Sequence, residues 1–370
     1  MTDAYPSRVV HLLPSTDAAG AENQARYLLA ALADASEDRK LAPELVYFRP
    51  GRAHERFAAL GIPMHQITPR GPLALDFPRR ARALRALYRG RPPAILHVWL
   101  YEAAVVGAVA ARAWPDTGVV MAQRSGTMMR ADRARTLALR AIRPRVDRVL
   151  SNSRDGLDLL QALGYDPGRM AITPNALPPE RLVTARPRDA VRAELGLGPS
   201  DAAVCVVGRA DATKDLSGLM QALAVLRAGR PDAHLVLAGP TAQDLASLGI
   251  SVPERTHALG WVGEPAEVMA ACDLLVVPSW TEGHSNAADE ALMLGLPVVS
   301  TNTGEHVSLV RRAGGRVVPI RDAEGLGAAM LELLRDPPDP ERVRAVARAE
   351  LSVGAVLAAT LDCYRPLLGG

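Results

Sequence analysis

The sequence predicts an α/β protein made of two doubly wound domains that face each other across a cleft. Short apolar runs of strand length alternate with amphipathic stretches of helical period along the whole chain. Nearly continuous apolar strands separated by helices are typical of parallel sheets that are covered on both faces. The chain has 370 residues, more than one ordinary hydrophobic core needs, and a proline-rich segment splits the strand-like runs into two series.

The first series predicts an N-terminal domain over residues 1–183. Its strand-like runs are Val9–Leu13, Glu44–Phe48, Ala94–Val98, Val119–Ala122 and Arg148–Ser151. Its amphipathic stretches include Ala21–Ala33, Ala81–Tyr88 and Asp155–Leu163. Ligands of such sheets bind beyond the carboxyl ends of the strands, so ligand-binding and catalytic residues are expected in the turns that follow these runs.

A second series predicts a C-terminal domain over residues 197–350. Residues 174–200 contain five prolines and little strand pattern, which places the linker near 180–195. The strand-like runs beyond it are Ala203–Val207, Ala233–Ala238, Leu274–Pro278, Pro297–Ser300 and Arg316–Pro319, with a helical stretch at Leu216–Ala228. The last helix, Val353–Leu368, follows a complete domain, so residues 351–370 are expected to pack back on the N-terminal domain.

Composition excludes several classes of protein. Apolar residues make up 48% and charged residues 22%, which is typical of globular domains. The three cysteines lie far apart and form no C-x-x-C pair, which favours free thiols in a reducing compartment and argues against a zinc site. No apolar run reaches the roughly 18 to 20 residues of a membrane span. The N-terminus lacks a signal-peptide pattern, so we expect a cytoplasmic protein.

Charge is distributed unevenly along the chain. Residues 1–185 carry 26 basic and 17 acidic side chains, whereas the remainder carries 17 basic and 23 acidic ones. Arginines concentrate at 79–91 and at 130–148, where apolar residues including Met128, Met129 and Leu137 accompany them. This pattern suits either two solvated helices or peripheral contact with the anionic inner face of a membrane. Aromatic residues are scarce and no binding motif appears, so nucleic acid is not an expected partner.

The first chemical pattern follows the first strand of the second series. The run ends at Gly208, Arg209 comes next, and Lys214 lies five residues later, where a helix starts. A guanidinium and an ammonium at a strand's carboxyl end are suited to neutralise a diphosphate. Two solvated surface charges are the alternative explanation of the pair.

The second pattern is a short loop between two apolar flanks. Glu282 and Glu290 are separated by seven residues, and Gly283, His284 and Ser285 precede a helix that should begin near Asn286. Backbone amides at a helix N-terminus bind anions, and glycine lets a ligand approach the backbone closely. Paired carboxylates accept hydrogen bonds from vicinal hydroxyls, which suggests sugar rings.

The third pattern is the turn after the first strand, Thr16–Gln24, in which Gly20 opens a helix. In a two-domain protein of this class the turn would face the other two patterns across the cleft. An ordinary strand-to-helix turn is the alternative.

These three patterns, in this order, resemble those of the retaining family-4 glycosyltransferases of GT-B fold. The glycine-rich turn resembles Ala19-Gly20-Ala21-Glu22, and the G-R-x(n)-K element resembles Gly208-Arg209 with Lys214. The E-x7-E element is similar to Glu282–Glu290, followed by G-L-P-V-V at Gly295–Val299. The resemblance covers nearly the whole chain.

The resemblance implies roles for individual residues. Arg209 and Lys214 would hold the donor diphosphate, Glu290 the ribose hydroxyls, and Glu282 the transferred sugar. Backbone amides near His284, Ser285 and Asn286 would approach sugar and phosphate, while Gly208, Gly283 and Gly20 would leave room for the donor. The donor would be a UDP- or GDP-sugar. No cofactor or metal is expected, since no D-x-D occurs in the cleft-facing stretches.

The acceptor side departs from the family's pattern. Relatives place a histidine where this chain has Gln123-Arg124-Ser125, and another group has W-M-Y-H where it has Trp99-Leu100-Tyr101-Glu102. His97 is expected at the end of the strand that contains the run Ala94–Val98. We therefore predict His97, Trp99 and Arg124 on the acceptor side, with a purely structural histidine as the alternative for His97.

The predicted function is transfer of a hexose-type sugar, with retention, from a nucleotide-diphosphate sugar to an unidentified glycan, glycolipid or small molecule. A nucleotide-sugar 2-epimerase of the same architecture and an inactive sugar-nucleotide-binding subunit are the alternatives. A dinucleotide oxidoreductase is disfavoured because G-x-G-x-x-G is missing after both first strands. A glycosidase is disfavoured because it needs no phosphate site.

Overall fold

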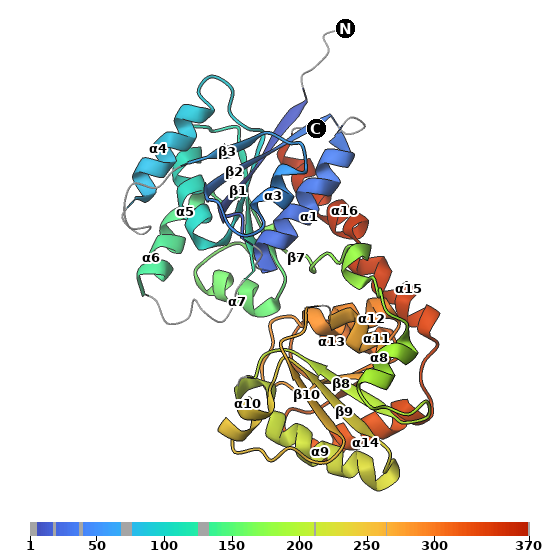
Figure 1. The fold of residues 1–370 in the computed structure, drawn as a ribbon. Helices are drawn as coiled ribbons and strands as arrows, with labels where there is room; N and C mark the ends of the chain where they lie inside the picture. Colours follow the sequence, from blue (N-terminus) through green and yellow to red (C-terminus); the bar gives the residue numbers. More distant parts are fainter. Residues whose placement is uncertain are drawn as a thin grey trace. The chain divides into compact units, whose positions relative to one another are not determined.

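The structure is a computed structural model that describes residues 6–17, 20–36, 40–67, 76–124, 133–210, 212–263 and 265–368. The chain divides into two compact units (Figure 1). Unit 1 consists of Met1–Ala176 with Val353–Gly370, and unit 2 consists of Leu177–Ser352. Each is an α/β unit around one parallel sheet, as the alternation of apolar runs and helices predicts.

The sheet of unit 1 has the strand order β3-β2-β1-β4-β5-β6-β7 and is parallel throughout the part that the structure describes. Its strands are β1 (Ser7–Ser15), β2 (Leu41–Arg49), β3 (Met64–Gln66), β4 (Ile95–Trp99), β5 (Gly118–Gln123), β6 (Arg148–Ser151) and β7 (Met170–Ile172). Its helices are α1 (Gly20–Asp34), α3 (His54–Ala58), α4 (Phe77–Leu87), α5 (Leu100–Ala111), α6 (Arg133–Ile142), α7 (Arg154–Ala162) and α16 (Val353–Tyr364).

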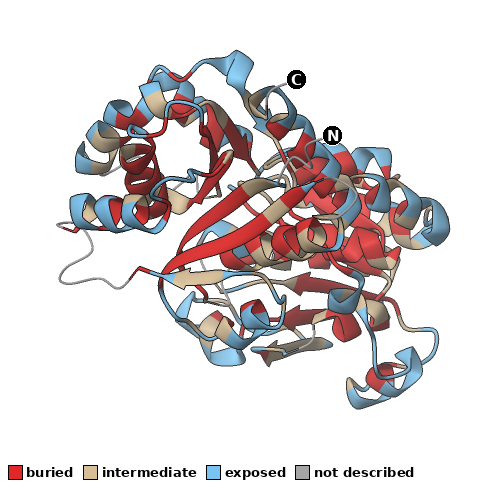
Figure 2. Ribbon diagram, turned by 90° about the horizontal axis from the view of Figure 1, so that it is seen from above, coloured by how far each residue is buried: buried red, intermediate tan, exposed pale blue. Residues whose placement is uncertain are grey.

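Side chains of unit 1 alternate between two apolar layers, as the period of two along a strand requires. Val10 and Leu12 of β1 belong to the layer that α4, α5, α6 and α7 cover. Val9 and Leu13 belong to the opposite layer, which α1, α3 and α16 cover. Figure 2 shows most strands in red and the outer sides of the helices in pale blue. The C-terminal helix is therefore part of the core of unit 1.

The sheet of unit 2 has the order β10-β9-β8-β11-β12-β13 and is also parallel. Its strands are β8 (Ala203–Val207), β9 (His234–Ala238), β10 (Thr256–Gly260), β11 (Leu274–Val277), β12 (Val298–Thr301) and β13 (Arg316–Val318). Helices α9 (Leu216–Gly229), α10 (Ala242–Ser247) and α14 (Ala323–Arg335) cover one face. The other face carries α8 (Arg188–Glu194), α11 (Pro265–Ala271), α12 (Asn286–Leu294), α13 (His306–Arg312) and α15 (Pro340–Leu351).

The proline-rich segment that was predicted to be the linker is part of unit 2 in the structure. Residues 180–195 lie inside unit 2 and contain α8, whose Val191 and Arg192 are buried. Arg192 donates hydrogen bonds to the carbonyl oxygens of Ala271 at 2.9 Å and Gly198 at 2.7 Å. Prolines therefore mark a strand-free stretch that packs on unit 2, and the change between units falls at residue 176 rather than 183.

Candidate functional site

The turns after β8 and β9 form a close backbone contact at the carboxyl edge of the unit 2 sheet. Gly239 has a φ of +127°, and a Cβ placed on it would lie 1.9 Å from the carbonyl oxygen of Gly208. Only glycine fits this conformation and this space. The backbone amide of Gly208 donates to the carbonyl oxygen of Ala238 at 3.0 Å. The two turns thus present bare backbone where β8 ends, which is where this class of sheet binds ligands.

Lys214 lies over this backbone. It ends a short 3₁₀ turn, η6 (Ala212–Lys214), and Asp215 caps α9 by accepting from the amide of Gly218. A Cβ on Gly208 would lie 3.7 Å from the Lys214 ammonium nitrogen. That ammonium group forms an ion pair with the carboxylate of Glu282. The two sequence patterns, 68 residues apart, therefore meet at one point.

Glu282 is held by three contacts besides its chain neighbours. Its Oε1 accepts from the Ser279 hydroxyl at 2.8 Å as well as from Lys214, and its backbone amide donates to Thr303 Oγ1 at 3.1 Å. Trp280 extends the connection, since its amide donates to the carbonyl oxygen of Thr213 at 2.7 Å. The loops after β8, β11 and β12 thus fix the carboxylate beside the ammonium group.

The loop between Glu282 and α12 is also tied down. Ser285 caps α12, with its hydroxyl accepting from the amide of Ala288 at 3.3 Å. His284 turns inward and pairs with Asp289, and both side chains are almost fully buried. Burial raises the pKa of Asp289, and the neighbouring imidazole opposes that rise. The first amides of α12 start at Asn286, a few residues after Glu282 in the chain, and add the positive end of a helix dipole.

Glu290 lies in the second turn of α12 and is 6% exposed. Its Oε1 accepts from Arg181 Nη2 at 2.5 Å. Burial raises the pKa of the carboxyl group, and the guanidinium of Arg181 counteracts that effect. Sequence reasoning missed Arg181, because it lies in the segment interpreted as a linker and 109 residues from its partner. No spacing rule connects the two.

Arg209, the other predicted phosphate-binding cation, follows Gly208 directly. Its side chain is exposed, and no carboxylate lies within ion-pair distance of it in the part of the chain that the structure describes. A guanidinium in this position is accessible to an anion that lies over the β8 turn. Unit 2 therefore gathers Gly208, Arg209, Lys214, Glu282 and the start of α12 at the carboxyl edge of its sheet.

Gly20 is the first residue of α1 in unit 1, as predicted, and a Cβ on it would meet no described atom within 4 Å. Its neighbour Ala19 lies outside the described residues, as do Ser125, Met128, Met129 and Arg130. The fold itself does not require glycine at position 20. Its predicted role, leaving room for a donor, concerns function alone.

His97 and Trp99 form a buried cluster in unit 1. His97 lies in the middle of β4, not at its end as expected, and its Nδ1 is 2.6 Å from the hydroxyl of Tyr364 on α16. Trp99 Nε1 donates to His11 Nδ1 at 3.2 Å. Burial lowers the pKa of His97 well below its usual value and that of His11 to about 3. Since His97 and Trp99 are 0% and 1% exposed, they support the fold and do not offer a surface to an acceptor.

Arg124 lies where β5 ends and is less enclosed than this cluster. Its guanidinium lies over the Trp99 ring at 5.4 Å and donates to the carbonyl oxygen of Thr173 and to Asn175 Oδ1. Its Nε finds no hydrogen-bond partner among the described residues. Burial lowers the pKa of Arg124 to about 10. Of the three predicted acceptor-side residues, this is the one whose position at a strand's carboxyl end suits a ligand contact.

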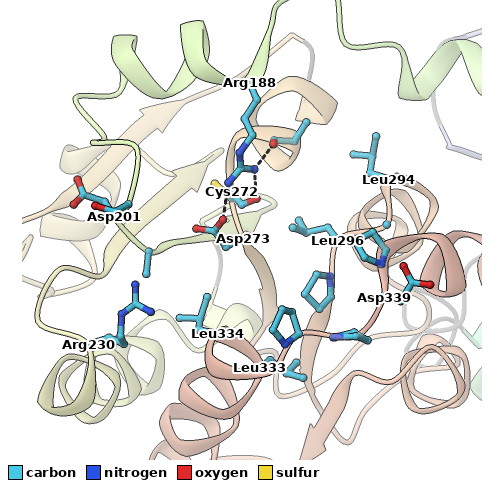
Figure 3. A pocket seen from close by; sticks show the side chains of 18 of the residues that line it. Arg188, Asp201, Arg230, Cys272, Asp273, Leu294, Leu296, Leu333, Leu334 and Asp339 are labelled. Atoms are coloured by element: carbon cyan, nitrogen blue, oxygen red, sulfur yellow. Dashed lines mark hydrogen bonds and ion pairs between the residues drawn. The ribbon is translucent and has the colours of Figure 1, made fainter.

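A pocket of about 610 Å³ opens at the opposite, amino edge of the unit 2 sheet (Figure 3). Its lining includes Asp201 before β8 and Asp273 before β11. Arg188 donates to Asp273 Oδ1 at 2.5 Å and to two carbonyl oxygens, so its guanidinium is already paired with groups of the pocket wall. The pocket lies away from the strand ends that carry the sequence patterns, and we do not assign it to the same site.

Two glycosyltransferase family models match the chain. The model described as Glycosyltransferase Family 4 matches residues 18–181, and the one described as Glycosyl transferases group 1 matches residues 201–336. A D-inositol 3-phosphate glycosyltransferase of Segniliparus rotundus is 32% identical over an alignment of 244 residues that covers 60% of this chain and 53% of that protein. The chain thus spans about half the length of this curated relative.

Solved structures share the fold along nearly the whole chain. Anabaena Alr3699/HepE in complex with UDP has a TM-score of 0.78 at 19% identity, over 97% of this chain and 100% of that one. A glycosyltransferase from Rickettsia africae has a TM-score of 0.80 at 13% identity, over 99% and 100%. Two parallel α/β units and these likenesses establish the GT-B fold. With both family models matched in the expected order, the chain belongs to the family-4 glycosyltransferases.

Proposed function

We propose that the protein is a retaining glycosyltransferase that moves a hexose-type sugar from a UDP- or GDP-sugar to a glycan, glycolipid or small-molecule acceptor. The observation that carries this proposal is the meeting of Lys214 with Glu282 over the backbone of Gly208. A cation, an acid and backbone without side chains at one strand edge match the parts of a nucleotide sugar. The HepE structure in complex with UDP supports a nucleotide as the ligand class.

Each group has a task in this proposal. Arg209 and Lys214 bind the diphosphate, and Glu290 binds the ribose hydroxyls. Glu282 binds the transferred sugar beside the amides near His284, Ser285 and Asn286. The two cations neutralise charge on the leaving phosphate, which we propose makes a metal ion unnecessary. The loss of one preorganised contact of this kind costs about 2.7–4 kcal/mol of transition-state stabilisation.

Retention follows from displacement on one face of the sugar. The bond between the anomeric carbon and the phosphate oxygen breaks, and the acceptor oxygen bonds to that carbon on the same face. The acceptor's proton passes to the departing phosphate oxygen. No nucleophile from the protein is needed, so the chain has to supply charge and orientation alone. We propose that Arg124 contacts the acceptor and that Gly20 leaves room for the donor.

The test combines a binding screen with product analysis. A thermal-shift screen of UDP-, GDP- and ADP-sugars should show one nucleotide that raises the melting temperature of the protein. The selected donor is then incubated with and without candidate acceptors, and the anomeric configuration of the product is read by NMR. A product that keeps the donor's configuration is expected. An inverted product overturns the mechanism, and an epimer formed from donor alone favours the 2-epimerase.

The second part of the proposal is peripheral contact with a membrane. Fewer arginines are available for it than the sequence suggests. Many of the arginines serve the fold: Arg85 and Arg145 donate to carbonyl oxygens where α5 ends, at 3.0 Å each from Nε. By contrast, α6 exposes Arg133, Leu137 and Arg140 on one side, and Leu137 is 64% exposed. An apolar side chain between two cations suits an anionic bilayer.

Liposome sedimentation tests this contact at low salt. Wild-type protein should sediment with phosphatidylglycerol vesicles and remain in solution with phosphatidylcholine vesicles. The double variant Arg133→Glu/Arg140→Glu should remain in solution with both, whereas Arg342→Glu on α15 of unit 2 should behave as wild type. Equal sedimentation of wild type with both lipids contradicts the contact. Sedimentation of the double variant with anionic vesicles to the same extent as wild type also contradicts it. No described helix is long and apolar enough to span a bilayer.

A further inference from the structure

Glu290 is in an unfavourable place for a carboxylate. Its side chain is 8% exposed, and burial disfavours the charged form. Asp289, the preceding residue, adds a like charge that raises the pKa of Glu290 further. A carboxyl group accepts hydrogen bonds from two hydroxyls most strongly when it is ionised, because protonation turns one oxygen into a donor and removes the charge that strengthens both bonds. Another group must therefore keep Glu290 charged.

Arg181 is the cation that acts on Glu290. Its Nη2 lies 2.5 Å from Glu290 Oε1, and the side chain is 45% exposed. The other charged groups near this part of α12 are engaged with Asp289: His284 pairs with it, and Glu350 on α15 acts on it electrostatically. Among the described groups, Arg181 thus supplies the positive charge that favours ionised Glu290.

The backbone around Arg181 is fixed, so the contact has a defined geometry. Arg181 belongs to a 3₁₀ turn, η5 (Pro179–Leu182), and its amide donates to the carbonyl oxygen of Pro178 at 3.0 Å. The amide of Leu177 donates to the carbonyl oxygen of Leu351 on α15 at 2.8 Å, and Leu182 packs against the core. The turn is therefore attached to the same helix layer that carries Glu290.

We propose that Arg181 is a positioning residue that holds Glu290 ionised and oriented for the ribose hydroxyls of the donor. This inference rests on the proposed function, in which Glu290 contacts the ribose. Arg181 occupies one lone pair of Oε1, and each carboxylate oxygen has two. Oε2 and the second lone pair of Oε1 remain for the two hydroxyls. The guanidinium itself need not touch the donor.

The test measures nucleotide affinity by calorimetry for wild type, Arg181→Ala, Arg181→Lys and Glu290→Gln. The probes are UDP, GDP and ADP together with their 2′,3′-dideoxy counterparts, from pH 5.5 to 9. Arg186→Ala is the matched control. Arg186 lies five residues further along the same segment and is also 45% exposed, but its Nε donates to Glu267 at 2.7 Å. Melting temperatures verify that each variant is folded.

Arg181→Ala should bind the preferred ribonucleotide about tenfold more weakly at pH 7, because the buried carboxylate then loses the charge-assisted hydrogen bond that favours its ionised form and fixes its orientation. The loss should shrink as pH rises, because Glu290 then ionises without help. Arg181→Lys should recover part of the affinity. Glu290→Gln should be weak at every pH, and adding Arg181→Ala to it should change little.

The dideoxy probes distinguish positioning from a merely structural role. Wild type and Arg181→Ala should bind them equally, because those ligands make no use of Glu290. Unchanged ribonucleotide affinity in Arg181→Ala overturns the inference, and so does an equal loss for both probe types. If wild type binds none of the three nucleotides, the proposed function itself fails. If wild type binds one of them and Arg181→Ala gives either of these two contrary results, only the inference about Arg181 fails.

Discussion

His306 lies at the first position of α13, under the loop that carries Glu282. It is 0% exposed, and its Nε2 is 2.9 Å from the hydroxyl of Ser300. Burial lowers its pKa to about 3, and the nearby His284 and Lys214 act in the same direction. A buried neutral imidazole fixes the base of the loop without adding a charge that would compete with the Lys214–Glu282 pair.

This environment makes unit 2 sensitive to acid. Unfolding frees an imidazole of pKa about 6.5, so the unfolded state binds more protons than the folded state between pH 6.5 and 3. His306 thus contributes stability above pH 6.5 that is lost as pH falls toward 3, by up to about 1.4 kcal/mol per pH unit. In urea unfolding from pH 7 to 5, His306→Gln should show a shallower decline of unfolding free energy than wild type.

The control for this prediction is His65→Gln, which changes a side chain that is 38% exposed in unit 1. It measures how far a histidine-to-glutamine change in the other unit alters the slope. If His306→Gln gives the wild-type slope, the imidazole is not held neutral in the folded state.

Residue-level prediction succeeded where contacts follow from strand ends and failed where they depend on packing. Lys214 and Glu282 each follow a strand of the same sheet, so spacing alone brings them to one edge. Arg181 and its contact with Glu290 depend on how an irregular segment packs on α12. The burial of His97 depends on α16, since its partner Tyr364 is 267 residues away. Such pairs leave no periodic signal in the sequence.

Among the secondary-structure elements, the strands β8 and β9 end in two turns that nearly touch at the carboxyl edge of the unit 2 sheet. Gly239 closes β9, and a methyl group there would overlap the carbonyl of Gly208. Because Lys214 lies over Gly208, displacing that carbonyl would also displace the ammonium group. The strand ends of unit 2 thus transmit small backbone changes directly to the cation.

Gly239→Ala should therefore destabilise unit 2 by about 2–4 kcal/mol, through backbone strain and overpacking together. Nucleotide affinity should fall in the fraction that remains folded. Gly249→Ala is the matched control, since Gly249 has a φ of +72° but a methyl group added there would meet no described atom within 4 Å. It should cost about 1–2 kcal/mol, the strain alone. Equal costs for the two variants, measured by chemical denaturation, would show that the close approach to Gly208 is unimportant.

The central strands were predictable and three edge strands were not. Buried strands such as β8 and β11 read as unbroken apolar runs, and their bounds nearly match the predictions. The missed strands are β3, β7 and β10, which lie at sheet edges. Their residues are mostly half-buried, so their apolar pattern is weak. Edge strands need neighbours on one side only, and the sequence constrains them less.

On the scale of the whole molecule, the charge asymmetry along the chain corresponds to the two units. The basic half forms unit 1 up to residue 176, and several of its arginines donate to carbonyl oxygens inside that unit. Unit 2 is acidic overall, yet it places Arg209 and Lys214 at the carboxyl edge of its sheet. Local placement of cations, rather than net charge, therefore determines where we expect an anionic donor.

The chain has two lysines, Lys40 and Lys214, which provides a direct test of the diphosphate cradle. Calorimetry compares UDP, GDP and ADP with the matching monophosphates for wild type, Lys214→Ala and Lys40→Ala. Wild type should prefer one diphosphate over its monophosphate, and Lys214→Ala should lose about 10- to 100-fold of that affinity, the worth of one charge-assisted hydrogen bond. Lys40→Ala should match wild type. Diphosphate binding by folded Lys214→Ala that equals wild type would contradict the account.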